Sequence, residues 1–105
     1  MVTTPLHRDE AIRLLRAVEP QIRELGVDRL ALFGSVLRGE AHVDSDVDIL
    51  VEFRPGAKSF SRFLALSDLL EETLGRAVDL VTREALSPFI GPRILSEAED
   101  VLRAA

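Results

Sequence analysis

The stretch from Leu32 to Phe53, LFGSVLRGEAHVDSDVDILVEF, decides the fold expected for this chain. An apolar run ends there at a Gly-Ser turn, a polar loop follows, and Asp46-Val47-Asp48 leads into a second apolar run. Side chains of a strand alternate between its two faces, so we expect Asp46 and Asp48 to share one face. The stretch therefore predicts two strands joined by a loop, with two carboxylates positioned by the backbone at the start of the second strand.

Helices and one further strand are expected around this stretch. Apolar residues at spacings of three and four predict a helix that begins at Thr4-Pro5, ends at Gly26 and is kinked or split at Pro20. The elements expected after it are a strand at 27–33, a helical turn at 35–38, a loop at 39–45, a strand at 46–54, a helix at 61–74 and a strand at 77–82. In the last strand, alternation places Asp79 on the face opposite Val78 and Leu80.

The pattern after residue 83 is less regular. Ser87-Pro88 predicts a short helix that Gly91-Pro92 interrupts, and a new helical segment is expected from Pro92 to Ala98. Val101-Leu102 is expected to form a brief edge strand. The order of these elements predicts a single α+β domain over residues 1–105, with a small mixed sheet and helices packed on one face.

The composition narrows the class of protein. The 105 residues carry a formal net charge of −5, which argues against direct binding to a nucleic acid backbone. Cysteine is absent, so neither a disulfide framework nor a thiolate metal site is possible. We see no signal peptide and no apolar run of membrane length, and we expect a cytoplasmic protein.

Three aspartates, Asp46, Asp48 and Asp79, are the candidate metal ligands. Two like charges about 4 Å apart repel each other by roughly 4 kcal/mol at an effective dielectric near 20, so a cation is needed if they meet. Carboxylate oxygens without cysteine favour a hard ion, Mg²⁺ or Mn²⁺. Mg²⁺ binds a few carboxylates together with substrate phosphates, which points to a phosphate-bearing ligand.

The Gly34-Ser35 turn is the candidate phosphate site. Glycine lets the backbone approach a ligand closely, and the Ser35 hydroxyl and the following N–H groups can then face a phosphate. Arg38 adds a planar charged donor one turn later, and Ser45 opens the Ser-Asp-x-Asp segment. We assign Gly34, Ser35, Arg38 and Ser45 to nucleotide binding, whereas His42 and Asp44 are expected to be ordinary loop residues.

Each of these motifs alone also has a structural explanation. A lone Asp-x-Asp is typical of the solvated face of a strand, and a lone Gly-Ser is typical of an ordinary turn. The shared site is favoured because all the parts occur together: a Gly-Ser turn at a strand end, a Ser-Asp-x-Asp that opens the next strand, and a third Asp on a later strand.

The combination resembles the minimal nucleotidyltransferases of the DNA polymerase β superfamily. The motifs that carry the resemblance are Gly34-Ser35-x-x-Arg38-Gly39, Ser45-Asp46-x-Asp48 and Val78-Asp79-Leu80-Val81. The resemblance implies a polymerase β palm-like fold, two Mg²⁺ or Mn²⁺ ions held by the three aspartates, and a nucleoside triphosphate held at the Gly-Ser turn. Asp79 is hypothesised to help deprotonate the acceptor hydroxyl. The chain departs from the family at Leu37, where a small residue is common.

The resemblance also implies a partner. Chains of this kind are often encoded beside a helical HEPN-domain protein, and the implied activity is that of an antitoxin that transfers AMP from ATP to a tyrosine of the toxin. One alternative is a non-catalytic antitoxin that binds nucleotide and inhibits its partner by occupancy. Another is a small-molecule nucleotidyltransferase, which the missing acceptor-binding domain disfavours.

Overall fold

The computed structural model describes residues 4–103, and in that range one mixed sheet holds four strands in the order β3-β2-β1-β4. The strands are β1 (Val27–Phe33), β2 (Val47–Phe53), β3 (Val78–Thr82) and β4 (Glu99–Arg103). β1 runs antiparallel to both of its neighbours, whereas β2 and β3 are parallel. The predicted α+β class with a mixed sheet is confirmed, and β4 is the edge strand expected at Val101-Leu102.

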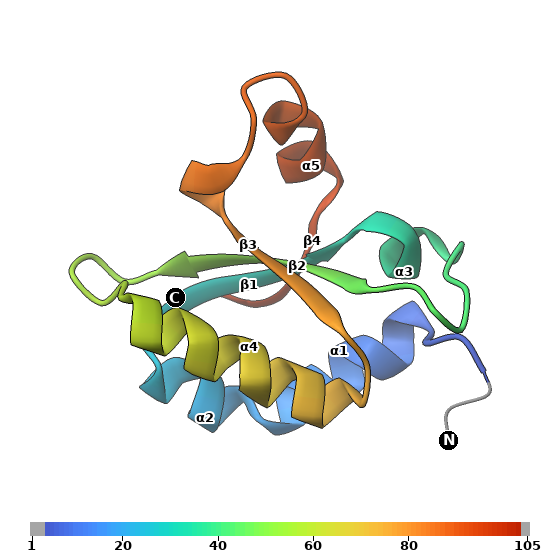
Figure 1. The fold of residues 1–105 in the computed structure, drawn as a ribbon, viewed down its shortest axis with the longest axis horizontal. Helices are drawn as coiled ribbons and strands as arrows, with labels where there is room; N and C mark the ends of the chain where they lie inside the picture. Colours follow the sequence, from blue (N-terminus) through green and yellow to red (C-terminus); the bar gives the residue numbers. More distant parts are fainter. Residues whose placement is uncertain (1–3, 104–105) are drawn as a thin grey trace.

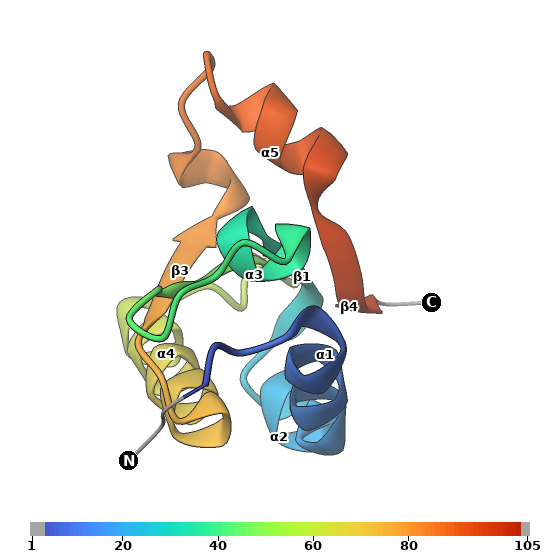
Figure 2. The same cartoon turned by 90° about the vertical axis from the view of Figure 1, so that its right-hand side faces the viewer.

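Three helices cover one face of the sheet (Figures 1 and 2). They are α1 (Arg8–Ala17), α2 (Glu19–Glu24) and α4 (Phe60–Leu74). The main core lies between these helices and the sheet, and its fully buried members include Leu15, Ile22, Leu30, Leu32, Ile49, Leu66 and Leu70. Pro20 lies in the first turn of α2 and separates it from α1, as predicted from the sequence.

The first helix begins later than predicted. α1 starts at Arg8, after His7 in an extended conformation, so the expected start at Thr4-Pro5 is wrong. The preceding segment is held in other ways: Leu6 is buried in the core, and the Thr4 carbonyl accepts a hydrogen bond of 2.6 Å from Arg76 Nη2. These tertiary contacts outweigh the local preference of Thr-Pro for a helix start.

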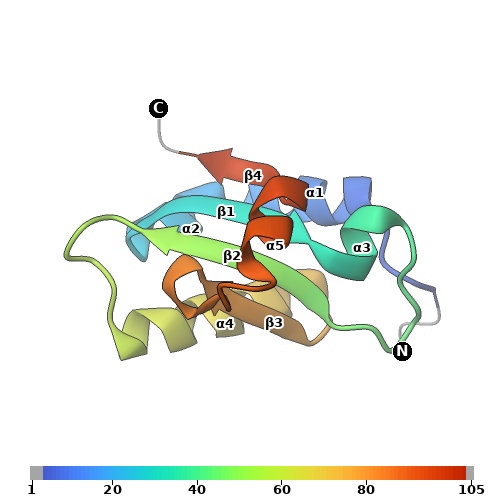
Figure 3. The ribbon, with the colours of Figure 1, turned by 90° about the horizontal axis from the view of Figure 1, so that it is seen from above.

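The other face of the sheet is only partly covered. The chain leaves β3 through the 3₁₀ turn η1 (Arg83–Ala85), crosses over this face as α5 (Gly91–Glu97), and returns as β4 beside β1 (Figure 3). A small second core there joins the strand residues Ala31, Phe33 and Leu50 to α5 and the segment before it. α5 thus adds partial cover on a face for which no helix was predicted.

The predicted helix at Ser87-Pro88 is wrong. Residues 88–90 form a turn, in which the Ser87 carbonyl accepts a hydrogen bond of 2.7 Å from Gly91 N–H. The regular helix begins only at Gly91, with Pro92 in its first turn, in agreement with the segment expected from Pro92 to Ala98. No helix within residues 4–103 is both long and apolar enough to cross a membrane.

A candidate nucleotidyltransferase active site

Asp48 and Asp79 lie side by side on the face crossed by α5. They are register partners in the parallel pair β2 and β3, so their side chains leave the same face of neighbouring strands. The pairing extends one step before the strands, because Val47 N–H donates to the Ala77 carbonyl at 3.0 Å. Asp48 is half-buried and Asp79 is exposed, so both carboxylates reach solvent.

The environment of Asp48 disfavours its charged form. Partial burial, followed by the charges of Asp79 and Asp46, raises the pKa of Asp48, and a hydrogen bond between the Asp48 and Asp79 carboxyl groups acts in the same direction. The charge of Arg38 opposes this shift. A carboxylate pair of this kind is stabilised by a shared proton or by a cation.

Asp46 is the one predicted aspartate that lies outside the strands. It is exposed and precedes β2, and within residues 4–103 no three acidic or histidine side chains are grouped closely enough to hold a metal ion. Its charge still reaches Asp48, because Coulomb interactions extend further than coordination distances. The structure therefore brings two of the three predicted ligands together. This pair fits Mg²⁺, which commonly takes one or two carboxylates and completes its shell with phosphates and water.

Gly34 is positioned directly against Asp48. It is the first residue of α3 (Gly34–Arg38), is buried, and has a φ of +76°. A Cβ at this position would overlap Asp48 Oδ2 and lie 2.8 Å from Asp48 Cγ. Phe33, the residue before Gly34, is the register partner of Asp48 on β1. The turn from β1 into α3 thus packs directly against the carboxylate pair.

Arg38 is occupied by two carboxylates. Its Nη1 donates to Glu97 Oε1 at 2.7 Å and its Nε donates to Glu40 Oε1 at 2.6 Å. The same Glu97 oxygen accepts a hydrogen bond of 3.1 Å from Gly34 N–H. Glu97 belongs to α5, so this contact ties α5 to the predicted phosphate turn. Arg38 lies beside the turn as expected, but its charge is already paired with those of Glu40 and Glu97.

The remaining predicted residues lie in α3 and in the loop after it. Ser35 is in the first turn of α3, and its side chain is half-buried. Ser45 Oγ accepts a hydrogen bond of 2.8 Å from His42 N–H, so this hydroxyl shapes the loop before Asp46. Both His42 and Asp44 are exposed, as expected of loop residues.

A hollow of about 270 Å³ opens between α3 and α5. Gly34 and Arg38 line one side, and α5 with the residue before it contributes Ile90, Arg93, Ile94 and Glu97. No site role was predicted from the sequence for Arg93 or Glu97. Their spacing of four places them on one face of a helix, but only the tertiary structure shows that this face meets the Gly-Ser turn.

Comparison with known proteins identifies the family. Residues 15–101 match the family of nucleotidyltransferase domains. The chain belongs to this family. A relative, the protein adenylyltransferase MntA of Thermococcus cleftensis, is 42% identical over 90 residues, which cover 85% of this chain and 90% of the relative.

Solved structures support the same assignment. A structure described as a minimal nucleotidyltransferase candidate is 37% identical and has a TM-score of 0.70, with 84% of this chain and 93% of that chain covered. A toxin–antitoxin structure with AMP-PNP is 25% identical and has a TM-score of 0.65, with 94% of this chain and 75% of that chain covered. The predicted nucleotidyltransferase fold and enzyme class are thereby confirmed.

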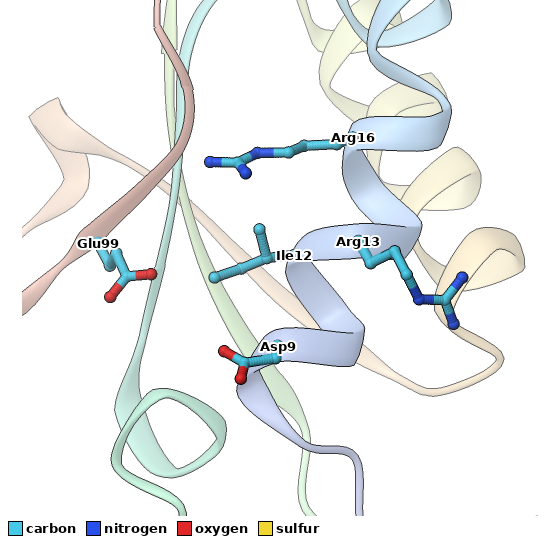
Figure 4. A pocket seen from close by; sticks show the side chains of 5 residues that line it. All are labelled: Asp9, Ile12, Arg13, Arg16 and Glu99. Atoms are coloured by element: carbon cyan, nitrogen blue, oxygen red, sulfur yellow. The ribbon is translucent and has the colours of Figure 1, made fainter.

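A second hollow on this nucleotidyltransferase, of about 440 Å³, lies between α1 and β4 (Figure 4). Ile12 and Arg16 point from α1 toward the strands, whereas Arg13 points away from them. Arg16 Nε donates to the Val101 carbonyl at 3.2 Å, which ties α1 to β4. β1 lies between β4 and β2, the strand that carries Asp48, and neither Asp48 nor Asp79 lines this hollow.

Proposed function

We propose that this nucleotidyltransferase transfers AMP from ATP, with Mg²⁺ or Mn²⁺, to a tyrosine hydroxyl of a helical HEPN-type toxin and thereby acts as its antitoxin. The observation that carries the proposal is the pair formed by Asp48 and Asp79, held in register on parallel strands and packed against Gly34. A similar relative named as a protein adenylyltransferase and a similar toxin–antitoxin structure with AMP-PNP support the substrate and partner.

The electrostatics of the site favour a metal-bound nucleotide. Asp46, Asp48, Asp79 and Glu97 place four carboxylates around the Gly34 turn, and Arg38 is already paired with Glu97 and Glu40. A bare triphosphate would meet net negative charge, whereas a triphosphate bound to Mg²⁺ would not. Two such ions, held by the aspartates, would neutralise phosphate charge in the transition state.

In the proposed reaction, the acceptor hydroxyl oxygen attacks the α-phosphorus of ATP. A new oxygen–phosphorus bond forms, the bond from the α-phosphorus to the bridging oxygen of the β-phosphate breaks, and pyrophosphate leaves. Asp79 is the exposed member of the carboxylate pair, and we assign it the hydroxyl proton. Gly34 and Ser35 hold the phosphates, while Asp46 and Asp48 complete the metal-binding set.

A non-catalytic antitoxin that binds nucleotide and inhibits by occupancy is the second candidate. The double pairing of Arg38 and the separate position of Asp46 favour it, because both leave the site short of its predicted set of ligands. This candidate predicts nucleotide binding and toxin inhibition without chemical change of the toxin.

Intact-protein mass spectrometry separates the two candidates. The proposed HEPN-type partner would be incubated with the chain, ATP and Mg²⁺, and Asp48→Asn would serve as the matched control. A mass increase of one adenylyl group with the parent protein, located on a tyrosine and absent with Asp48→Asn, supports the enzyme. Inhibition of the toxin without any added mass refutes the transferase and supports the passive antitoxin.

A further inference from the structure

Arg93 is an exposed cation on α5, the helix that meets the Gly-Ser turn. The side chain is exposed, and it forms no hydrogen bond or ion pair with any residue between 4 and 103. Glu97 stands four residues later, a spacing that suits an ion pair on a helix. Glu97 instead accepts from Gly34 N–H and Arg38. α5 therefore presents an uncompensated positive charge to the active-site side of the molecule.

The position of Arg93 is defined by the hollow between α3 and α5. Arg93 lines this hollow together with Gly34 and Arg38. Gly34 also packs against Asp48, so a residue that lines the hollow touches one member of the Asp48–Asp79 pair. A ligand with one end at the carboxylate pair and the other end in the hollow would pass over Gly34.

The chemistry of the hollow suits an anion. A carboxylate oxygen already lies there, because Glu97 Oε1 accepts hydrogen bonds from Gly34 N–H at 3.1 Å and from Arg38 Nη1 at 2.7 Å. Phosphate oxygens accept from the same kinds of donor, and charged donors bind them more strongly than neutral ones do. The arrangement shows that an anionic oxygen fits between α3 and α5, within the hollow that Arg93 lines.

We propose that Arg93 binds the β- and γ-phosphates of the nucleotide, so that α5 forms the outer wall of the triphosphate site. This inference rests on the proposed function, which places the α-phosphate at Asp48 and Asp79. A planar guanidinium can bind two phosphate oxygens at once and keeps its charge at any working pH. It would also stabilise the negative charge that develops on the departing pyrophosphate.

The same side chain could instead stack on the base, since Ile90 and Ile94 give the hollow an apolar part. The two roles differ in their dependence on the number of phosphates. If Arg93 binds phosphate, it strengthens the binding of ATP far more than the binding of AMP. It then also strengthens the binding of inorganic tripolyphosphate, which has no base. If Arg93 stacks on the base, it strengthens the binding of ATP and of AMP equally and does not change the binding of tripolyphosphate.

The test compares Arg93→Ala and Arg93→Lys with Arg13→Ala. Arg13 is an exposed arginine on α1 that points away from the strands, so its removal changes the net charge equally without touching the site (Figure 4). Unliganded melting temperatures would establish that all variants are folded. Calorimetry would then measure the dissociation constants of ATP, AMP and tripolyphosphate, each with Mg²⁺.

We expect Arg93→Ala to raise the dissociation constants of ATP and tripolyphosphate about tenfold or more. The dissociation constant of AMP should stay within about twofold of the parent value. Arg93→Lys should lose less, and Arg13→Ala should match the parent. Equal losses for ATP and AMP, or no loss for ATP, would overturn the role of Arg93 while leaving the proposed function intact. If the parent protein does not bind ATP with Mg²⁺, the proposed function is overturned, and this inference with it.

Discussion

A Cβ on residue 34 would overlap Asp48 Oδ2, so Gly34 and the Asp48 carboxyl group are packed directly on each other. Gly34 thus has two reasons to be glycine. Its φ of +76° lies in the left-handed region, and its missing side chain leaves room for the carboxylate that faces Asp79. Gly39 has almost the same φ, +74°, but a Cβ added there would meet no atom within 4 Å.

Gly34→Ala and Gly39→Ala should therefore separate backbone strain from damage to the site. Both variants should lose about 1–2 kcal/mol of unfolding free energy through the left-handed backbone. Gly34→Ala should lose more than this and should also fail to respond to ATP with Mg²⁺, because the new methyl group displaces Asp48. Denaturant unfolding and thermal shifts would measure both effects. A ligand response retained by Gly34→Ala would contradict the close packing.

Asp48→Asn should stabilise the metal-free protein at neutral pH. The raised pKa of Asp48 means that the folded state holds this proton more tightly than the unfolded state does. Stability therefore falls as the pH rises from about 3.9, the ordinary Asp value, through the raised folded value. Asparagine cannot ionise, so it avoids this loss of stability at neutral pH. The gain in unfolding free energy should be less than about 1 kcal/mol, because the group is partly solvated.

The gain from Asp48→Asn should vanish below the ordinary Asp pKa, where the proton is bound in both states. Urea unfolding at neutral and acidic pH would check this, with the exposed Asp68→Asn on α4 as a control of equal charge change. A destabilised Asp48→Asn at neutral pH would show that the carboxylate pair carries no repulsion.

Glu97→Gln should tighten the binding of ATP with Mg²⁺. Glutamine keeps an oxygen that can accept from Gly34 N–H but removes the negative charge that an incoming phosphate approaches. We expect a dissociation constant lower by about fivefold, measured by calorimetry. Glu72→Gln, at an exposed position on α4, provides the matched control. Weaker binding in Glu97→Gln would mean that the charge of Glu97 holds Arg38 in a conformation that the nucleotide needs.

Removal of the metal should abolish the nucleotide response. ATP with Mg²⁺ at about 100 times its dissociation constant should add roughly 2.7 kcal/mol of stability and raise the melting temperature. ATP with EDTA should have almost no effect, because the carboxylates around Gly34 repel an uncompensated triphosphate. Mg²⁺ alone is the control. An equal shift with EDTA would argue against the metal-bound nucleotide as the ligand.

The elements that meet in the sheet could be predicted because their signals are local. Alternation within β2 and β3 placed Asp48 and Asp79 on defined faces, and glycine marked the turn after β1. Parallel pairing of β2 and β3 then brought the two carboxylates together. Asp46 differs because it precedes β2, where no ladder partner fixes its side chain.

The contributions of α5 could not be predicted from local signals. Arg93 and Glu97 have the spacing of an ordinary surface pair on a short helix. Nothing within this segment of sequence indicates that the helix crosses the sheet. The pairing of Glu97 with Gly34 and Arg38 spans about sixty residues of chain and depends on β4 docking beside β1. The start of α1 was mispredicted for the same reason, because the burial of Leu6, which holds the preceding segment, is a tertiary contact.

The crossing of α5 from one edge of the sheet to the other sets an order for assembly during synthesis. A nascent chain that has emerged only as far as β3 already carries both paired aspartates and the Gly-Ser turn. It does not yet have α5 positioned opposite α3, because that position depends on the pairing of β4 with β1. The hollow between α3 and α5 is therefore completed only when β4 pairs with β1, which couples its formation to closure of the described sheet.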